Sequence, residues 1–122
     1  MTIKDLDAFF ADGWNRHDVD ALMTFMADDC VFEGVGGPDA CGRRYEGRER
    51  VRDAFARIFA AVPDVRFDDV RHFLAGGRGV SEWTFKGTTT EGKKLEVNGC
   101  DLFTFRDGKI AVKSSYFKNR TT

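Results

Sequence analysis

The sequence predicts a single α+β domain whose helices pack on one side of a β-sheet and enclose an apolar pocket. Apolar residues recur at helical spacing up to residue 62, and alternating strand patterns with hairpin turn signals dominate from residue 65 onward. The chain has 122 residues, which is enough for one domain with its own core. Helices followed by a run of strands are typical of an α+β fold, and we assign one domain to residues 1–122.

Two helices are predicted at the start of the chain. The first runs from Thr2 to about Gly13, with Thr2 and Asp5 placed as a capping box. Its apolar face comprises Ile3, Leu6, Phe10 and Trp14. The second begins at Asp18, a favoured N-cap residue, and is predicted to end at Asp28–Asp29. Its apolar side comprises Ala21, Leu22, Phe25 and Met26.

A strand and a third helix follow. The strand spans residues 30–35 and is broken by Gly36, Gly37 and Pro38. The helix is the clearest of the three, because its apolar residues fall at i, i+4, i+7, i+8 and i+11 before Pro63 ends it. These positions are Val51, Phe55, Ile58, Phe59 and Val62.

Four consecutive strands are predicted in the second half of the chain. They span Val65–Leu74, Gly79–Thr89, Lys94–Phe105 and Lys109–Phe117. Glycine-containing turn signals at residues 75–77, 91–92 and 107–108 separate them. Strands of this length joined by short turns favour an antiparallel meander.

Asp101 breaks the pattern of the third of these strands. Side chains alternate between the two faces of a strand, and the odd positions form its apolar face. These positions are Leu95, Val97, Gly99, Asp101, Phe103 and Phe105. A carboxylate among apolar neighbours needs strong hydrogen-bond partners, or desolvation raises its pKa. Asp101 is therefore a candidate acid–base or ligand-binding residue, with pairing to an arginine or a backbone amide as the structural alternative.

Other polar residues are candidate helpers of Asp101. His72 shares a strand face with Val70 and Leu74, so it is expected either to face the same interior or to be a satisfied core histidine. Tyr116 follows Ile110 and Val112 in register and could offer its hydroxyl to the pocket. The catalytic candidates are thus Asp101, His72 and Tyr116, whereas the face of Glu82 stays open.

Composition excludes several classes of function. The net charge of −1 provides no field to attract nucleic acid, and no apolar stretch approaches the length of a membrane span. The N-terminal residues lack the layout of a signal peptide, so we expect a cytoplasmic protein. Three cysteines without metal-type spacing predict no metal site. The 12 phenylalanines favour an aromatic core or an apolar cavity lining.

Several segments together resemble the nuclear transport factor two-like superfamily, and within it the SnoaL-like polyketide cyclases and ketosteroid isomerase-like proteins. The resemblance covers nearly the whole chain. The segments that carry it are residues 14–22, 25–30, 45–48, 82–88 and 101–110, which read WNRHDVDAL, FMADDC, YEGR, EWTFKGT and DLFTFRDGKI.

The resemblance implies a cone, in which about three helices pack on the concave face of a curved, mixed but mostly antiparallel sheet around a deep pocket. It also implies a homodimer, a small apolar or aromatic ligand and no cofactor. The aromatic residues expected at the pocket are Phe10, Trp14, Phe32, Phe55, Phe59, Trp83 and Phe103.

Position by position, Asp101 matches the aspartate that acts in both families. In the cyclases this residue resembles the acid–base group, and in the isomerases it is the protonated acid that donates to an oxyanion. Two isomerase positions differ here. The position of the general base is Gly34, with Glu33 beside it, and the position of the oxyanion tyrosine is Phe10. A proton transfer that lacks its base loses orders of magnitude in rate.

The favoured hypothesis is a cofactor-free enzyme in which Asp101 moves a proton on a largely apolar carbonyl compound, by cyclase-like aldol closure or isomerase-like enolisation. The alternatives are a non-catalytic binder of small molecules and a protein-interaction module of the same fold.

Overall fold

A computed structural model describes residues 1–121 of the chain, and its order of elements follows the predicted order apart from a short strand, Arg44–Glu46, that the sequence analysis did not predict. The helical segments are α1 (Ile3–Ala8), the π-helix η1 (Phe9–Trp14), α2 (Val19–Thr24) and α3 (Arg48–Ala61). The strands are β1 (Met26–Glu33), β2 (Arg44–Glu46), β3 (Arg66–Ala75), β4 (Arg78–Thr88), β5 (Lys94–Arg106) and β6 (Lys109–Phe117). The four predicted strands of the second half are confirmed to within one or two residues.

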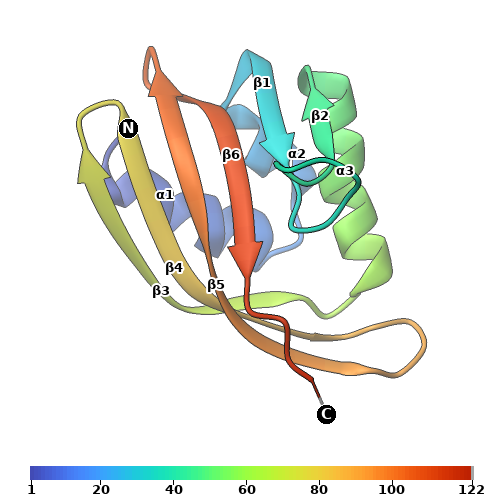
Figure 1. Cartoon of the computed structure of the whole chain (residues 1–122). Coiled ribbons are helices and arrows are strands. Elements are labelled where there is room, and N and C mark those ends of the chain that lie inside the picture. Colours follow the sequence, from blue (N-terminus) through green and yellow to red (C-terminus); the bar gives the residue numbers. More distant parts are fainter. Residues whose placement is uncertain (122) are drawn as a thin grey trace.

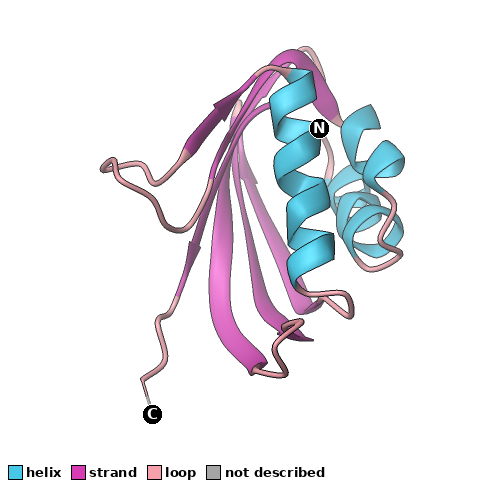
Figure 2. Cartoon of the chain, turned by 90° about the vertical axis from the view of Figure 1, so that its right-hand side faces the viewer, coloured by secondary structure: helices cyan, strands magenta, loops and turns pink. Residues whose placement is uncertain are grey.

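The six strands form one mixed sheet in the order β2-β1-β6-β5-β4-β3. β1 and β6 pair in parallel, and all other neighbours are antiparallel. The sheet bends strongly along β3, β4 and β5 (Figure 1), and the helices all lie on its concave side (Figure 2). The fold is therefore the predicted α+β cone. None of the helices in residues 1–121 is long and apolar enough to cross a membrane.

The first helix differs from the continuous α-helix that the spacing predicts. It changes to π-helical geometry after Ala8, where the Asn15 amide donates to the Phe10 carbonyl five residues earlier at 2.8 Å. This wider turn brings Trp14 into the core. The Asn15 side chain then exchanges two hydrogen bonds, of 2.8 and 2.9 Å, with the backbone of Phe67. The end of the helix is thus fixed to the start of β3.

The predicted end of the second helix is wrong. α2 ends at Thr24, and Asp28–Asp29 lie exposed within β1, which begins four residues before the predicted strand at residue 30. The Arg48 guanidinium explains the early end, because it donates to the carbonyls of Met23 and Met26 at 3.0 and 2.8 Å. These bonds satisfy one carbonyl of the last helical turn and one at the start of β1.

Candidate functional site: an apolar cavity with a buried lysine–aspartate pair

A cavity of about 470 Å³ lies between α3, the loop after β1 and the concave face of the sheet. Trp14, Phe32 and Trp83 line it, as the sequence predicts. The other predicted pocket aromatics do not line it and instead fill the core around it. These are Phe10, Phe55, Phe59 and Phe103.

The reason for this difference is edge-to-face packing among the aromatic rings. Phe55 packs against Trp14 at 5.0 Å and against Phe32 at 5.1 Å, so it supports two lining residues from behind. Phe103 is fully buried against Phe9. Periodicity identifies the buried face of each element, but it does not separate the cavity wall from the layer behind that wall.

Asp101 is fully buried on the concave face of β5, as the alternation predicts. Its Oδ2 accepts a hydrogen bond from Trp83 Nε1 at 3.0 Å. Its Oδ1 accepts from Lys113 Nζ at 3.0 Å and from Ser115 Oγ at 2.5 Å. Both carboxylate oxygens are therefore satisfied, which is what a buried charge requires.

Strand register brings these partners together. Asp101 pairs with Ser115 across β5 and β6, and Lys113 lies on the same face of β6, two residues earlier. Trp83 lies on β4 opposite Gly99. A Cβ at position 99 would lie 2.6 Å from the Trp83 ring, so only glycine leaves room for the indole to reach the carboxylate.

Lys113 is a cavity residue that the sequence analysis missed, as is Ser115. Its side chain is 3% exposed, and its Nζ also donates to Ser115 Oγ at 2.8 Å. The ammonium lies 4.8 Å from the ring centre of Phe32 and 5.3 Å from that of Trp14. Lys113 and Ser115 line the cavity, whereas Asp101 lies behind them. A bound molecule would therefore meet the lysine first.

Burial changes how readily the Lys113 ammonium loses its proton. Desolvation lowers the pKa of Lys113 below its usual range, and the charge of Asp101 opposes that shift without cancelling it. The aromatic faces around Nζ supply a further attraction to the charged form. Proton exchange between the amine and the carboxylate is thus possible within a single hydrogen bond.

The prediction that Tyr116 offers its hydroxyl to the pocket is wrong, because its side chain is 53% exposed on the convex face. Pairing shifts register between Thr104↔Val112 and Phe105↔Ile110, which leaves Ala111 as an extra residue in β6. A bulge of this kind exchanges the inward and outward positions that follow it. Ile110 faces the core, but beyond Ala111 it is the odd-numbered residues that face the cavity.

His72 is buried but lies outside the cavity lining. Its Nε2 is 2.9 Å from Asp7 Oδ1, its Nδ1 is 2.7 Å from Ser81 Oγ, and its ring stacks on Phe10. This Asp–His–Ser order resembles a nucleophilic triad, yet Ser81 is fully buried and does not reach the cavity. The geometry fits the satisfied core histidine, one of the two readings of the sequence.

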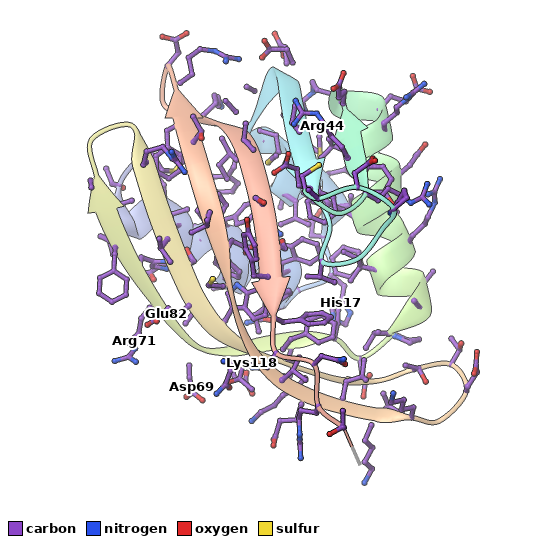
Figure 3. The ribbon with its side chains drawn as sticks, viewed as in Figure 1. His17, Arg44, Asp69, Arg71, Glu82 and Lys118 are labelled. Atoms are coloured by element: carbon purple, nitrogen blue, oxygen red, sulfur yellow. The ribbon has the colours of Figure 1, made fainter. Side chains whose placement is uncertain are left out.

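The remaining acidic candidates, Glu33 and Glu82, do not line the cavity and form ion pairs instead. Glu33 pairs with Arg44 at 2.8 Å, and Glu82 pairs with Arg71 at 3.7 Å, side by side on β3 and β4 (Figure 3). Gly34 lines the cavity at the position of the isomerase base and brings no carboxylate to it. The charged residues of the lining are all cationic: Arg43, Arg57 and Lys113. Residues 1–121 contain no cluster of three or more potential metal ligands.

The fold is an α+β cone with a largely apolar cavity between α3 and the concave face of the sheet. The model of the SnoaL-like domain family matches residues 6–113, and the chain belongs to that family. No curated protein matches the sequence.

Solved structures share the fold at low sequence identity. A candidate polyketide cyclase from Pseudomonas putida KT2440 superposes with a TM-score of 0.84 at 21% identity, over 97% of this chain and 92% of the other. One from Xanthomonas campestris pv. campestris gives 0.82 at 22% identity, over 94% and 88%. A ketosteroid isomerase-like protein from Catenulispora acidiphila, in complex with trimethylamine, gives 0.81 at 24% identity, over 97% and 88%.

Proposed function

We propose that this protein binds a small, largely apolar carbonyl compound in its cavity and catalyses proton transfer on it without a cofactor. The single observation that carries the proposal is the Lys113–Asp101 pair, which is buried from solvent and presents a cation at a largely apolar wall. A rigid ion pair in a dry site stabilises developing charge far better than the same groups do in water.

In this mechanism the ligand's carbonyl oxygen accepts a hydrogen bond from Lys113 Nζ. The ammonium polarises the carbonyl and stabilises the enolate that forms when the neighbouring carbon gives its proton to Ser115 Oγ, which passes its own proton to Asp101 across their hydrogen bond. Asp101 acts through Lys113 and Ser115, since both contact it and both reach the cavity. This arrangement replaces the direct action of Asp101 that the sequence suggests. Enolisation of this kind begins both an isomerisation and an aldol cyclisation.

Hydrogen–deuterium exchange at the carbon next to the carbonyl tests the proposal. Small aromatic ketones incubated with the protein in D₂O should exchange faster than in buffer, as followed by proton NMR. Asp101→Asn and Lys113→Met should each lower the rate about 100-fold or more, the effect typical of losing a positioned acid–base group. Lys118→Met removes an exposed lysine and is the matched control. Exchange that stays unchanged in both pocket variants would refute the mechanism.

The second candidate function is ligand binding without turnover. The full satisfaction of the Asp101 oxygens favours it, as does the missing carboxylate at Gly34. Under this reading aromatic ketones raise the melting temperature by mass action, yet no isotope exchange follows. NMR titration of Asp101 with and without ligand distinguishes the two, because a carboxylate that stays ionised and paired throughout favours the binder.

We also propose a homodimer formed through the convex face of the sheet. Phe73 and Tyr116 are 56% and 53% exposed there, and large apolar side chains on an open sheet face are typical of an interface. Phe73→Asp should convert the dimer to a monomer in light scattering coupled to size exclusion. A wild-type chain that is monomeric at all concentrations would exclude this dimer.

A further inference from the structure

Lys113 combines the features of a nucleophilic amine. Within residues 1–121 it is the one lysine that lines the cavity, and its Nζ is held by two hydrogen bonds among three aromatic rings. The other six lysines, at positions 4, 86, 93, 94, 109 and 118, are exposed or partly exposed and do not line this cavity. The proposed proton transfer requires only that the Lys113 ammonium donates a hydrogen bond to the ligand. That step does not require the amine to be buried beside Asp101, a group that can take up its proton. This burial therefore calls for a second explanation.

We propose that Lys113 is also a covalent catalyst, whose Nζ forms an imine with the carbonyl carbon of an aldehyde or ketone bound in the cavity. The inference rests on the proposed function, because it assumes the same carbonyl ligand in the same pocket. A desolvated lysine next to an apolar surface is the setting in which imine formation with carbonyl substrates occurs near neutral pH.

The proton balance can be met by the groups present. The Lys113 ammonium first gives a proton to Asp101 across their 3.0 Å contact, which leaves the nitrogen lone pair free. The lone pair attacks the carbonyl carbon, a C–N bond forms as the C=O π bond breaks, and the carbonyl oxygen takes up a proton from the attacking nitrogen. Asp101 then returns its proton through Ser115, which touches both Asp101 and Lys113, and water leaves. In total, one ammonium and one carbonyl give one protonated imine and one water.

The imine would activate the ligand more strongly than a hydrogen bond does. A protonated imine withdraws electrons from the neighbouring carbon as a full positive charge, so that carbon loses a proton or breaks a bond to a leaving group more readily. The same residue would thereby support retro-aldol or decarboxylation chemistry as well as enolisation.

Charge on the cavity wall narrows the ligand class further. Arg43 and Arg57 line the cavity, and neither pairs with a carboxylate within residues 1–121. No aspartate or glutamate belongs to the lining. A carbonyl compound that also carries a carboxylate would place its apolar body against the aromatic wall and its anion near these arginines. Aromatic oxo acids are therefore the expected ligands.

Borohydride trapping tests the imine with two matched probes, benzaldehyde and 4-formylbenzoate. The protein is incubated with each probe at pH 7, reduced with sodium borohydride, and analysed by intact mass and peptide mapping. The expected result is one adduct per chain, located at Lys113, with a higher yield for 4-formylbenzoate. Exposed lysines, which lack this apolar surrounding, should take up less of the probe at the same dose. Lys113→Arg should abolish the adduct, and Lys118→Arg should retain it.

Adducts spread evenly over the surface lysines of the wild-type chain would overturn the inference, and this outcome needs no variant to fold. Equal yields for the two probes would overturn the role of the arginines. Borohydride trapping tests the imine and isotope exchange tests the proton transfer, so either experiment can fail while the other succeeds. Deuterium exchange without an adduct would refute the imine and leave proton transfer standing. Absence of ligand binding in a thermal-shift assay, together with absence of exchange, would refute the proposed function itself.

Discussion

The Nζ of Lys113 lies 3.0 Å from Oδ1 of Asp101, in a contact where the two side chains are 3% and 0% exposed. In a buried ion pair the two charges attract each other strongly, but both groups lose their hydration shells. These two contributions often nearly cancel, so the pair adds little to the free energy of unfolding. Retention of such a pair at a cavity wall is more readily explained by chemistry than by folding.

Replacing one partner of the Lys113–Asp101 pair should destabilise the protein more than replacing both partners together. Lys113→Met leaves a buried carboxylate without its counter-ion and should lower the free energy of unfolding by about 3–5 kcal/mol. Asp101→Asn leaves the buried Lys113 ammonium without its counter-ion and should also lower the free energy of unfolding. The double variant should be more stable than the sum of the single effects predicts, by about 1–3 kcal/mol. Urea unfolding of the four proteins measures this coupling, and simple additivity would show that the two groups do not interact.

Stability should rise with pH through the alkaline range because of Lys113. Its pKa is lowered in the folded protein, so between that value and the ordinary value near 10.4 the unfolded chain binds more protons than the native one. Below this pH window, burial of the Lys113 ammonium lowers the free energy of unfolding by its full desolvation cost. This destabilisation disappears as the pH rises through the window. The urea midpoint of the wild-type chain should therefore increase from pH 7 to pH 10 relative to that of the double variant. A flat difference would indicate an unperturbed lysine.

Gly99 should be intolerant of a side chain. A Cβ there would meet Tyr116 O at 2.4 Å, and β5 would have to move away from the neighbouring strand. The same Cβ would displace Trp83 from Asp101. Gly99→Ala should destabilise the fold by about 1–3 kcal/mol and weaken ligand binding. Gly77→Ala is the control, since its nearest contact is an ordinary 3.7 Å. Equal effects of the two changes on thermal unfolding would contradict this account.

The sequence could predict the burial of Asp101 because alternation along β5 is regular from Leu95 to Phe103. It could not predict Lys113, since a single extra residue at Ala111 changes which side of β6 faces inward. Periodicity carries no signal for that shift, because Ile110 and Val112 are both apolar. The same bulge explains why Tyr116 looked like a pocket residue. An inward lysine becomes visible only when β6 is aligned with β5.

The helical region shows a similar limit. Spacing identified most of the buried helix positions, but it placed the exposed Ile3 on an apolar face and left out the buried Phe9 and Met23. The π-helical turn after Ala8 rests on packing and on the bonds from Asn15 to Phe67, which are far apart in sequence. Which aromatic side chains line the cavity depends on the same distant contacts. Local patterns thus define the elements, and tertiary register decides what reaches the site.

A buried polar row crosses the sheet from His72 through Ser81 and Asp101 to Ser115, each residue paired in register with the next. Hydrogen bonds join His72 to Ser81 and Asp101 to Ser115. If the row serves only to satisfy buried groups, Ser81→Ala should lower stability by about 1 kcal/mol and leave deuterium exchange and borohydride trapping unchanged. A fall in exchange of tenfold or more in a folded Ser81→Ala variant would instead mean that protons pass along this row from the exposed Asp7 carboxylate, and would return His72 to the catalytic machinery.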